Sequence, residues 1–235
     1  MSFSDILKQY PYTTELHAHT FPVSPCGDLS PEEVVKVYRE VGATSLVITN
    51  HLLPFRAEGD IKANAEEYIE DYLKAKEAAG DDLDVILGVE LRFTENNNDY
   101  LVFGICEEDI AHFISLLPYG IENFYKEAKN ERNVIIQAHP FRKGIELAPI
   151  GSIDGIESLN MHPGHNSRVS IGCRYAKLKD LLVTGGTDFH HLGHQGLCLM
   201  RTQNRMRDSY DVAAAIKSRE VLFDCSGHII IPYIY

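Results

Sequence analysis

The sequence feature that most constrains the fold is a histidine pair near the N-terminus, formed by His17 and His19. The pair ends a short run of alternating apolar and polar residues, a pattern that predicts a β-strand. Side chains two positions apart on a strand point to the same side, so both imidazoles face one point in space. Neutral imidazoles suit first-row divalent metal ions. Two histidines alone are equally typical of an ordinary strand, so a metal site needs further ligands from other strands.

Metal-type side chains also follow four later runs of apolar residues, and these are His51, Glu90, His139 and the pair Asp188 and His190. Continuous apolar runs are typical of strands buried in a parallel sheet. Because the carboxyl ends of parallel barrel strands open on one face, we expect these side chains to converge there. With the first pair they make seven nitrogen and oxygen ligands. One ion needs about three or four ligands, so the sequence predicts at least two divalent ions.

Helical stretches alternate with the predicted strands. Ser30 and Glu33 predict a capping box at the start of one helix, and Gly42 predicts its end. A longer helix is predicted over 62–79. The alternation predicts a single α/β domain over residues 1–235, folded as a TIM-like barrel. A doubly wound open sheet is the alternative, although the chain lacks the G-x-G-x-x-G and P-loop motifs of nucleotide-binding folds.

The charge of the chain bears on its partners. A net charge of −12 and a pI of about 5.3 argue against stable binding of nucleic acid, which needs a basic surface. A small phosphorylated substrate is compatible with this charge, because bound cations reverse its sign locally. The sequence leaves the oligomeric state open.

The cysteines and the hydropathy bear on the compartment. The five cysteines are odd in number, widely spaced and free of C-x-x-C motifs: Cys26, Cys106, Cys173, Cys198 and Cys225. This usage indicates reduced thiols rather than a disulfide framework or a thiolate zinc site. Residues 1–12 lack the features of a secretory signal, and no apolar run approaches the roughly 18–20 residues of a membrane span. We therefore expect a cytoplasmic location without membrane contact.

The order of these motifs resembles the PHP (polymerase and histidinol phosphatase) family of metal-dependent phosphoesterases. The matching motifs span residues 15–191 and are His17-Ala18-His19, Ile48-Thr49-Asn50-His51, Gly88-Val89-Glu90, Ala138-His139-Pro140 and Gly186-Thr187-Asp188-Phe189-His190. The resemblance implies a distorted (β/α)7 TIM-like barrel and the hydrolysis of a phosphoester. It also implies a centre of two or three divalent metal ions, with zinc, manganese and iron all compatible.

The resemblance further implies how the ligands are divided among three ions. His17, His19, Glu90 and Asp188 would hold the first, Glu90 and His139 the second, and His51 and His190 the third. Glu90 is therefore expected to bridge two ions, because a carboxylate has two oxygens to share.

Three positions depart from the family pattern. Cys26 stands where the family often has an Asp or His ligand of the third ion; a thiolate there would favour zinc, and an inert loop thiol is the equal alternative. Leu101 stands where a histidine ligand of the second ion often lies, and leucine cannot ligate. Asp99 lies on the same strand face but about 6–7 Å further along, so it substitutes only if the strand shifts. Asn50 replaces an acid that commonly precedes His51.

These observations predict an enzyme, a phosphatase or phosphoesterase that most simply hydrolyses a phosphomonoester with a metal-activated water. Its candidate catalytic residues are Asp188 at the metal centre, His190 as proton donor to the leaving oxygen, and Arg142 as phosphate clamp. A solvated loop arginine is the alternative for Arg142. Further histidines in loops after strands either line the pocket or lie at its rim, namely His162, His165, His191 and His194.

Two other functions stay open. A metal-binding regulatory module that has lost catalysis is supported by the ligand missing at Leu101. An amidohydrolase-type metal hydrolase also begins with H-x-H, but there a bridging lysine is common and the final acid stands alone. Glu90 at a strand end, and the pairing of Asp188 with His190, favour the phosphoesterase.

Overall fold

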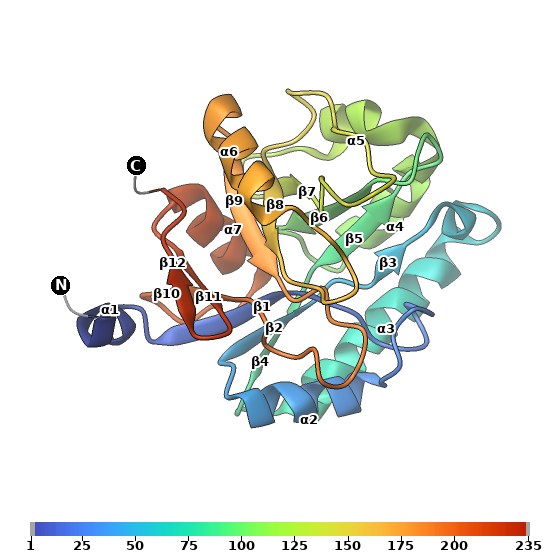
Figure 1. Ribbon diagram of the computed structural model, residues 1–235. Coiled ribbons are helices and arrows are strands. Elements are labelled where there is room, and N and C mark those ends of the chain that lie inside the picture. Colours follow the sequence, from blue (N-terminus) through green and yellow to red (C-terminus); the bar gives the residue numbers. More distant parts are fainter. Residues whose placement is uncertain (1–2, 234–235) are drawn as a thin grey trace.

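Strands and helices alternate along the chain in the computed structural model, which describes residues 3–233 (Figure 1). The strands are β1 (Tyr12–Ala18), β2 (Ser45–Ile48), β3 (His51–Leu52), β4 (Asp84–Leu87), β5 (Val89–Arg92), β6 (Asp99–Phe103), β7 (Val134–Gln137), β8 (Gly155–Asn160), β9 (Leu182–Gly186), β10 (Leu199–Thr202), β11 (Leu222–Cys225) and β12 (His228–Ile230). The α-helices are α1 (Phe3–Gln9), α2 (Pro31–Val41), α3 (Ile61–Ala79), α4 (Asp109–Leu116), α5 (Gly120–Ala128), α6 (Val169–Lys179) and α7 (Ser209–Ser218). The 3-10 helices η1 (Pro54–Ala57) and η2 (Leu117–Tyr119) complete the regular elements of this range. None of the helices in residues 3–233 has the length and hydropathy of a membrane-spanning segment.

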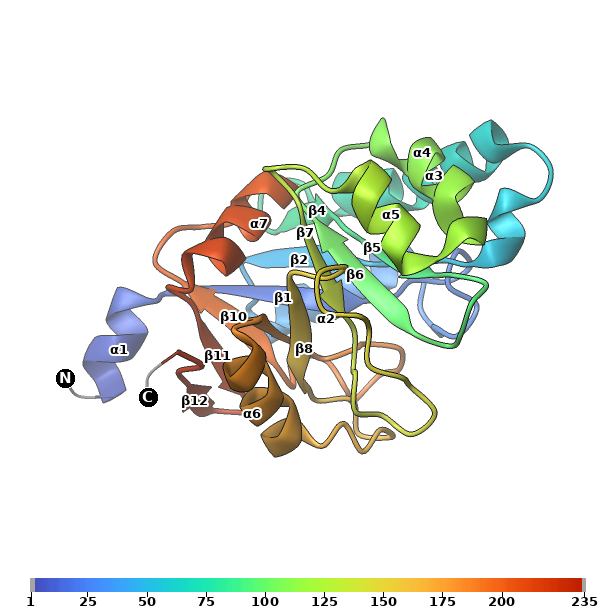
Figure 2. The same cartoon turned by 90° about the horizontal axis from the view of Figure 1, so that it is seen from above.

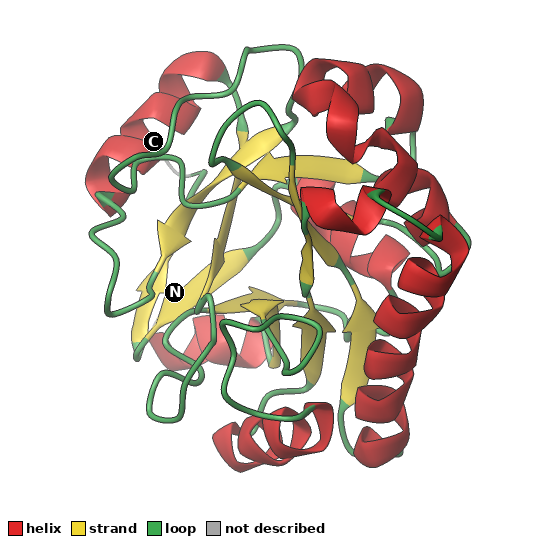
Figure 3. Ribbon diagram, turned by 90° about the vertical axis from the view of Figure 1, so that its right-hand side faces the viewer, coloured by secondary structure: helices red, strands yellow, loops and turns green. Residues whose placement is uncertain are grey.

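The strands form two six-stranded sheets, with the orders β12-β11-β10-β1-β2-β4 and β3-β5-β6-β7-β8-β9. The sheets run into one another, because β2 leads into β3 and β4 leads into β5 after Gly88. A bridge between Ala18 and Phe189 also connects the end of β1 with the segment after β9. In Figure 3 the strands occupy the middle of the molecule and the helices lie along the outside. The expected α/β class is confirmed, whereas closure into a seven-stranded barrel stays a prediction.

The expectation of parallel pairing is wrong at two places. β10 pairs antiparallel with β1 and β11, and β6 pairs antiparallel with both of its neighbours, β5 and β7. The reason at β6 is its connection to β5: residues 93–98 are too few for the crossover of a dozen or more residues that parallel strands need. As a result, the first residue of β6 lies opposite the last residue of β5, in the pair Arg92 and Asp99.

The helix signals of the sequence are confirmed where they were strongest. The Ser30 hydroxyl accepts the backbone N–H of Glu33, and the Glu33 carboxylate accepts that of Ser30, which together make the capping box of α2. Gly42 ends α2 with a φ of 79°, a left-handed conformation that glycine adopts without strain. The sequence reasoning missed α1, which lies beyond the start of β1 and away from the other helices (Figure 2).

A buried acid at the core of the first sheet connects β1 to the segment after β9. Glu15 Oε1 accepts hydrogen bonds from the backbone N–H groups of Leu16, His17 and Thr187, at 3.1, 3.1 and 2.9 Å. The Tyr38 hydroxyl on α2 donates to Glu15 Oε2 at 2.7 Å. Burial disfavours the charged form and raises the pKa of Glu15 to about 7, although these hydrogen bonds oppose the rise. The network joins three separate segments around the histidine pair.

The Tyr38→Phe variant is expected to lower the free energy of unfolding by about 1–3 kcal/mol, because it leaves a buried oxygen of Glu15 without its donor. Urea unfolding followed by circular dichroism measures this difference. The matched control is Tyr119→Phe, whose ring is 67% exposed and whose loss of a hydroxyl is expected to change stability by less than about 0.5 kcal/mol. Equal stability of Tyr38→Phe and the wild type would contradict the prediction.

Candidate metal centre

Side chains from β1, β5 and the segment after β9 meet at one point. Glu90 Oε1 lies 3.3 Å from His17 Nε2, and Glu90 Oε2 lies 3.3 Å from His19 Nε2. Asp188 Oδ1 lies 3.4 Å from His17 Nε2 and 3.6 Å from His19 Nε2. Ligands at about 2.0–2.2 Å from one tetrahedral ion lie about 3.3–3.6 Å from each other. Donor atoms of His17, His19 and Asp188 all lie within 4.8 Å of one another, which fits ligands of a common ion, and Glu90 reaches both imidazoles through its two oxygens.

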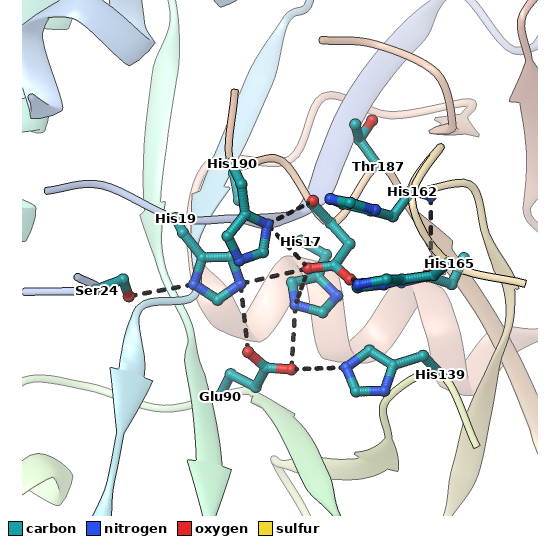
Figure 4. Close-up of polar contacts among 12 residues, drawn as sticks. His17, His19, Ser24, Glu90, His139, His162, His165, Thr187 and His190 are labelled. Atoms are coloured by element: carbon teal, nitrogen blue, oxygen red, sulfur yellow. Dashed lines mark hydrogen bonds and ion pairs between the residues drawn. The ribbon is translucent and has the colours of Figure 1, made fainter. Parts of the chain in front are cut away.

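Glu90 also contacts histidines on either side of this group. His139 Nε2 lies 3.3 Å from Glu90 Oε1, and His51 Nδ1 lies 3.0 Å from Glu90 Oε2. Figure 4 shows the Glu90 carboxylate between His19 and His139. Each carboxylate oxygen thus faces two imidazole nitrogens, an arrangement suited to a bridging ligand.

A second group of donors gathers at the loop between β1 and α2. Their donor atoms all lie within 4.8 Å of one another, and the residues are His19, Cys26, His51 and His190. Cys26 is exposed, while the other members are buried or half-buried. The structure therefore places the thiol of Cys26 beside the histidines expected to hold a third ion.

The centre holds buried polar atoms that find no hydrogen-bond partner within residues 3–233. They include the atoms of the cluster that lie against one another, namely His17 Nε2, His19 Nε2, His51 Nδ1 and both carboxylate oxygens of Glu90. An unsatisfied buried polar atom costs about 1–3 kcal/mol, and native proteins contain few of them. Because these atoms are the ones a divalent ion would bind, the residues present fit a metal centre.

The charges of the cluster also fit cations. Burial disfavours the ionised form of Glu90, but His17 and His51 outweigh it and hold the pKa of Glu90 well below its usual value. Burial likewise opposes the charged form of His51, and the Glu90 carboxylate overcomes it and raises the pKa of His51 to about 10. His190 differs, because burial and the nearby His19 lower its pKa to about 3. Its imidazole is therefore neutral, which is the form that ligates metals.

Two residues of β8 that sequence reasoning missed orient the cluster. Glu157 is buried and accepts a hydrogen bond from His17 Nδ1 at 2.9 Å, which leaves His17 Nε2 free to face the centre. Glu157 also accepts the backbone N–H of His139 at 3.1 Å. Asn160 donates to Glu157 at 2.9 Å and to Asp188 Oδ2 at 3.1 Å. The available signal was a single acid in the strand Gly155–Asn160, which also holds Ser158 and Asn160.

The positions that depart from the family pattern are placed as follows. Leu101 is buried directly opposite Glu90 on the neighbouring strand. Asp99 reaches the centre, because one of its oxygens lies within 4.8 Å of donor atoms of Glu90 and His51. Asp99 was expected to substitute for the missing ligand only if the strand shifts, and its role as a ligand stays a prediction. Asn50 faces away from these donors and donates to Asp71 Oδ2 on α3 at 2.7 Å.

A cavity of about 460 Å³ opens over the cluster and is lined by the expected residues Cys26, His51, Glu90, His139, Arg142, Asp188 and His190. Arg142 is half-buried, and its backbone N–H donates to the carbonyl of His139 at 3.0 Å, whereas its guanidinium makes no hydrogen bond or ion pair with any residue in the described range. Three loop histidines line the same cavity, namely His162, His165 and His191. His162 stacks on His165 with 3.9 Å between ring centroids, and it packs against His194 at 5.3 Å.

Comparison with known proteins connects this site to a family. The profile of the PHP domain matches residues 15–224. Among solved structures, PsfC from Pseudomonas syringae aligns with a TM-score of 0.63 and 15% identity, over 86% of this chain and 88% of PsfC. A two-domain protein from Bacteroides vulgatus, containing a predicted PHP-like metal-dependent phosphoesterase, aligns with a TM-score of 0.62 and 16% identity, over 90% of this chain and 64% of that protein. At this identity the likeness shows a shared fold, and no curated protein sequence matches the chain.

The Glu157→Gln variant is expected to weaken metal binding about 10- to 100-fold. The amide holds the His17 ring less firmly, and the negative charge of the Glu157 carboxylate beside the ring is lost. Titration of metal-free protein with Zn²⁺ in a calorimeter measures the change. Glu146→Gln is the matched control, since Glu146 is exposed. An unchanged affinity in Glu157→Gln would contradict the orienting role.

Proposed function

The chain belongs to the PHP domain family, and from this membership we propose that it is a metal-dependent phosphoesterase acting on a phosphomonoester. The observation that carries the proposal is the set of unpartnered buried donors at the base of a cavity that also presents Arg142. The proposed partner is a small phosphorylated molecule rather than nucleic acid, in keeping with the net charge of −12. We further propose one domain over residues 1–235; a cytoplasmic location remains a prediction from the cysteines.

The donor spacing supports two or three divalent ions, drawn from zinc, manganese and iron. We propose that His17, His19, Glu90 and Asp188 hold the first, Glu90 and His139 the second, and Cys26, His51 and His190 the third. Bound at such a centre, divalent ions activate water and neutralise charge on phosphoryl oxygens.

The chain's own residues contribute binding and orientation. Arg142 lines the cavity, and its guanidinium has no hydrogen-bond or ion-pair partner within residues 3–233, so it is available to bind two oxygens of a phosphate. His190 Nδ1 donates to the backbone carbonyl of Asp188 at 2.8 Å, which leaves Nε2 as the unprotonated nitrogen. With a pKa of about 3, His190 has no spare proton near neutral pH. This supports the role of metal ligand for His190 over that of proton donor.

The two alternative functions are less well supported. The residues that line the cavity in the described part of the chain include no lysine, which an amidohydrolase-type centre commonly uses as a bridge. The regulatory module was favoured by the ligand missing at Leu101, but Asp99 lies near enough to compensate.

Removal of metal is expected to abolish hydrolysis of an aryl phosphate, and Asp188→Ala to reduce it by about a thousandfold or more, because several kcal/mol of charge stabilisation are lost. Release of the phenol, with zinc, manganese or iron added back, measures the activity. His112→Ala, at an exposed position of α4, serves as the control variant. Full activity of the protein after removal of its metal by a chelator would contradict the proposal. Turnover of cyclic amides without hydrolysis of the aryl phosphate would favour the amidohydrolase function.

Arg142→Ala is expected to raise KM for the aryl phosphate about 10- to 100-fold, the equivalent of losing charge-assisted hydrogen bonds of about 1.5–3 kcal/mol. Its metal content should equal that of the wild type, because Arg142 contacts none of the donors. Lys143→Ala is the control, since the neighbouring lysine is exposed and does not line the cavity. If both variants retain the wild-type KM, Arg142 is a solvated loop residue and not a phosphate clamp.

A further inference from the structure

The antiparallel direction of β6 places an unexpected acid at the metal centre. In the pairing of β5 with β6, Glu90 faces Leu101 and Arg92 faces Asp99. Side chains of directly opposed residues point to the same side of a sheet, and so do residues two apart on one strand. These four side chains therefore share the face that carries Glu90, and Asp99 is only 1% exposed there.

The distances place the Asp99 carboxylate among the donors of the second ion. Asp99 Oδ2 lies 3.7 Å from His139 Nε2, which itself lies 3.3 Å from Glu90 Oε1. Donor atoms of Asp99 and Glu90 also lie within 4.8 Å of one another. Ligands of one ion at about 2.1 Å lie about 3.0–4.2 Å apart, depending on whether they are adjacent or opposite in the coordination sphere.

The partner of Asp99 holds the carboxylate without using all of its acceptor sites. Arg92 Nε donates to Oδ1 and Arg92 Nη2 to Oδ2, both at 2.7 Å. A carboxylate offers about four acceptor positions, so one on each oxygen remains available. The bidentate contact fixes the plane of the carboxylate, and Arg92 is 34% exposed at the cavity side.

The charge balance argues against a purely structural ion pair. Four buried carboxylates surround the centre, namely Glu90, Asp99, Glu157 and Asp188. Arg92 is paired with one of them, and in the described range histidines rather than lysines or arginines lie against the others. Asp99 and Glu90 nevertheless lie close enough for their carboxylates to repel each other. A cation between the two carboxylates would turn this repulsion into attraction on both sides.

We propose that Asp99 is a protein ligand of the ion shared by Glu90 and His139, and that Arg92 positions its carboxylate. Asp99 thereby takes the place of the histidine ligand that the family often has at the position of Leu101. The inference rests on the proposed metal-dependent function. It gives the second ion two carboxylates and one imidazole, a set that suits Mn²⁺ better than an imidazole-rich set does.

The test is Mn²⁺ binding to the metal-free full chain, with bound ions counted by elemental analysis after equilibrium dialysis. Asp99→Asn is expected to lose one Mn²⁺ per chain, or to bind it at least tenfold more weakly, while the remaining ions stay. Arg92→Gln is expected to keep the wild-type number of ions, because the Asp99 carboxylate is retained. The double variant Asp99→Asn/Leu101→His is expected to regain the lost ion, since an imidazole would then lie opposite Glu90.

The outcomes separate the possible failures. If Asp99→Asn binds as many Mn²⁺ ions as the wild type with the same affinities, Asp99 is only the partner of Arg92 and the inference is wrong. If the wild type binds no Mn²⁺, Zn²⁺ or iron, the proposed function itself fails. A crystal of the wild type with Mn²⁺ tests the inference without any variant: anomalous density within bonding distance of Asp99 supports it, and an ion bound only to Glu90 and His139 overturns it.

Discussion

The burial of negative charge at one end of the sheets is the constraint on which the rest of this structure depends. A buried carboxylate is tolerated only where hydrogen bonds or cations compensate for the lost water. Here the backbone N–H of His139, the amide of Asn160 and the guanidinium of Arg92 each meet one of the acids. The oxygens of Glu90 receive no such hydrogen bond within residues 3–233, and they are the atoms around which the imidazoles are arranged. The fold thus leaves the buried oxygens of Glu90 available to a positively charged group.

A different acid, Glu15, stabilises the backbone around the metal-type donors. Glu15 does not line the cavity, yet its oxygens hold β1, the segment at Thr187 and, through Tyr38, the helix α2. Because His17 is two residues along from Glu15, the position of the histidine pair relative to Asp188 depends on this network. The two acids therefore have different roles: Glu15 accepts hydrogen bonds from the protein and orders the backbone, whereas the oxygens of Glu90 are left without hydrogen-bond donors within residues 3–233.

Much of the centre could be predicted from sequence, because each expected ligand follows an apolar run that ends at the same side of the fold. Glu90 comes directly after such a run, and His51 follows one after Thr49 and Asn50. Glu157 could not be predicted in the same way, since orienting an imidazole requires only an acceptor at the correct distance and leaves no fixed spacing. The proximity of Asp99 to Glu90 could not be predicted, because the direction of β6 depends on the short connection from β5. The helix α1 spans only seven residues, which is too short for a helical period to be recognised in its sequence.

The hairpin between β5 and β6 also makes the composition of the centre sensitive to the length of one turn. Successive side chains of a strand alternate between faces, so inserting or deleting a single residue in 93–98 would slip the pairing by one step. Asp99 and Leu101 would then turn outward and the ring of Tyr100 would enter beside Glu90. A change in the length of this turn would therefore replace the oxygen donor Asp99 by an aromatic ring beside Glu90 while the sequence of β6 stays the same.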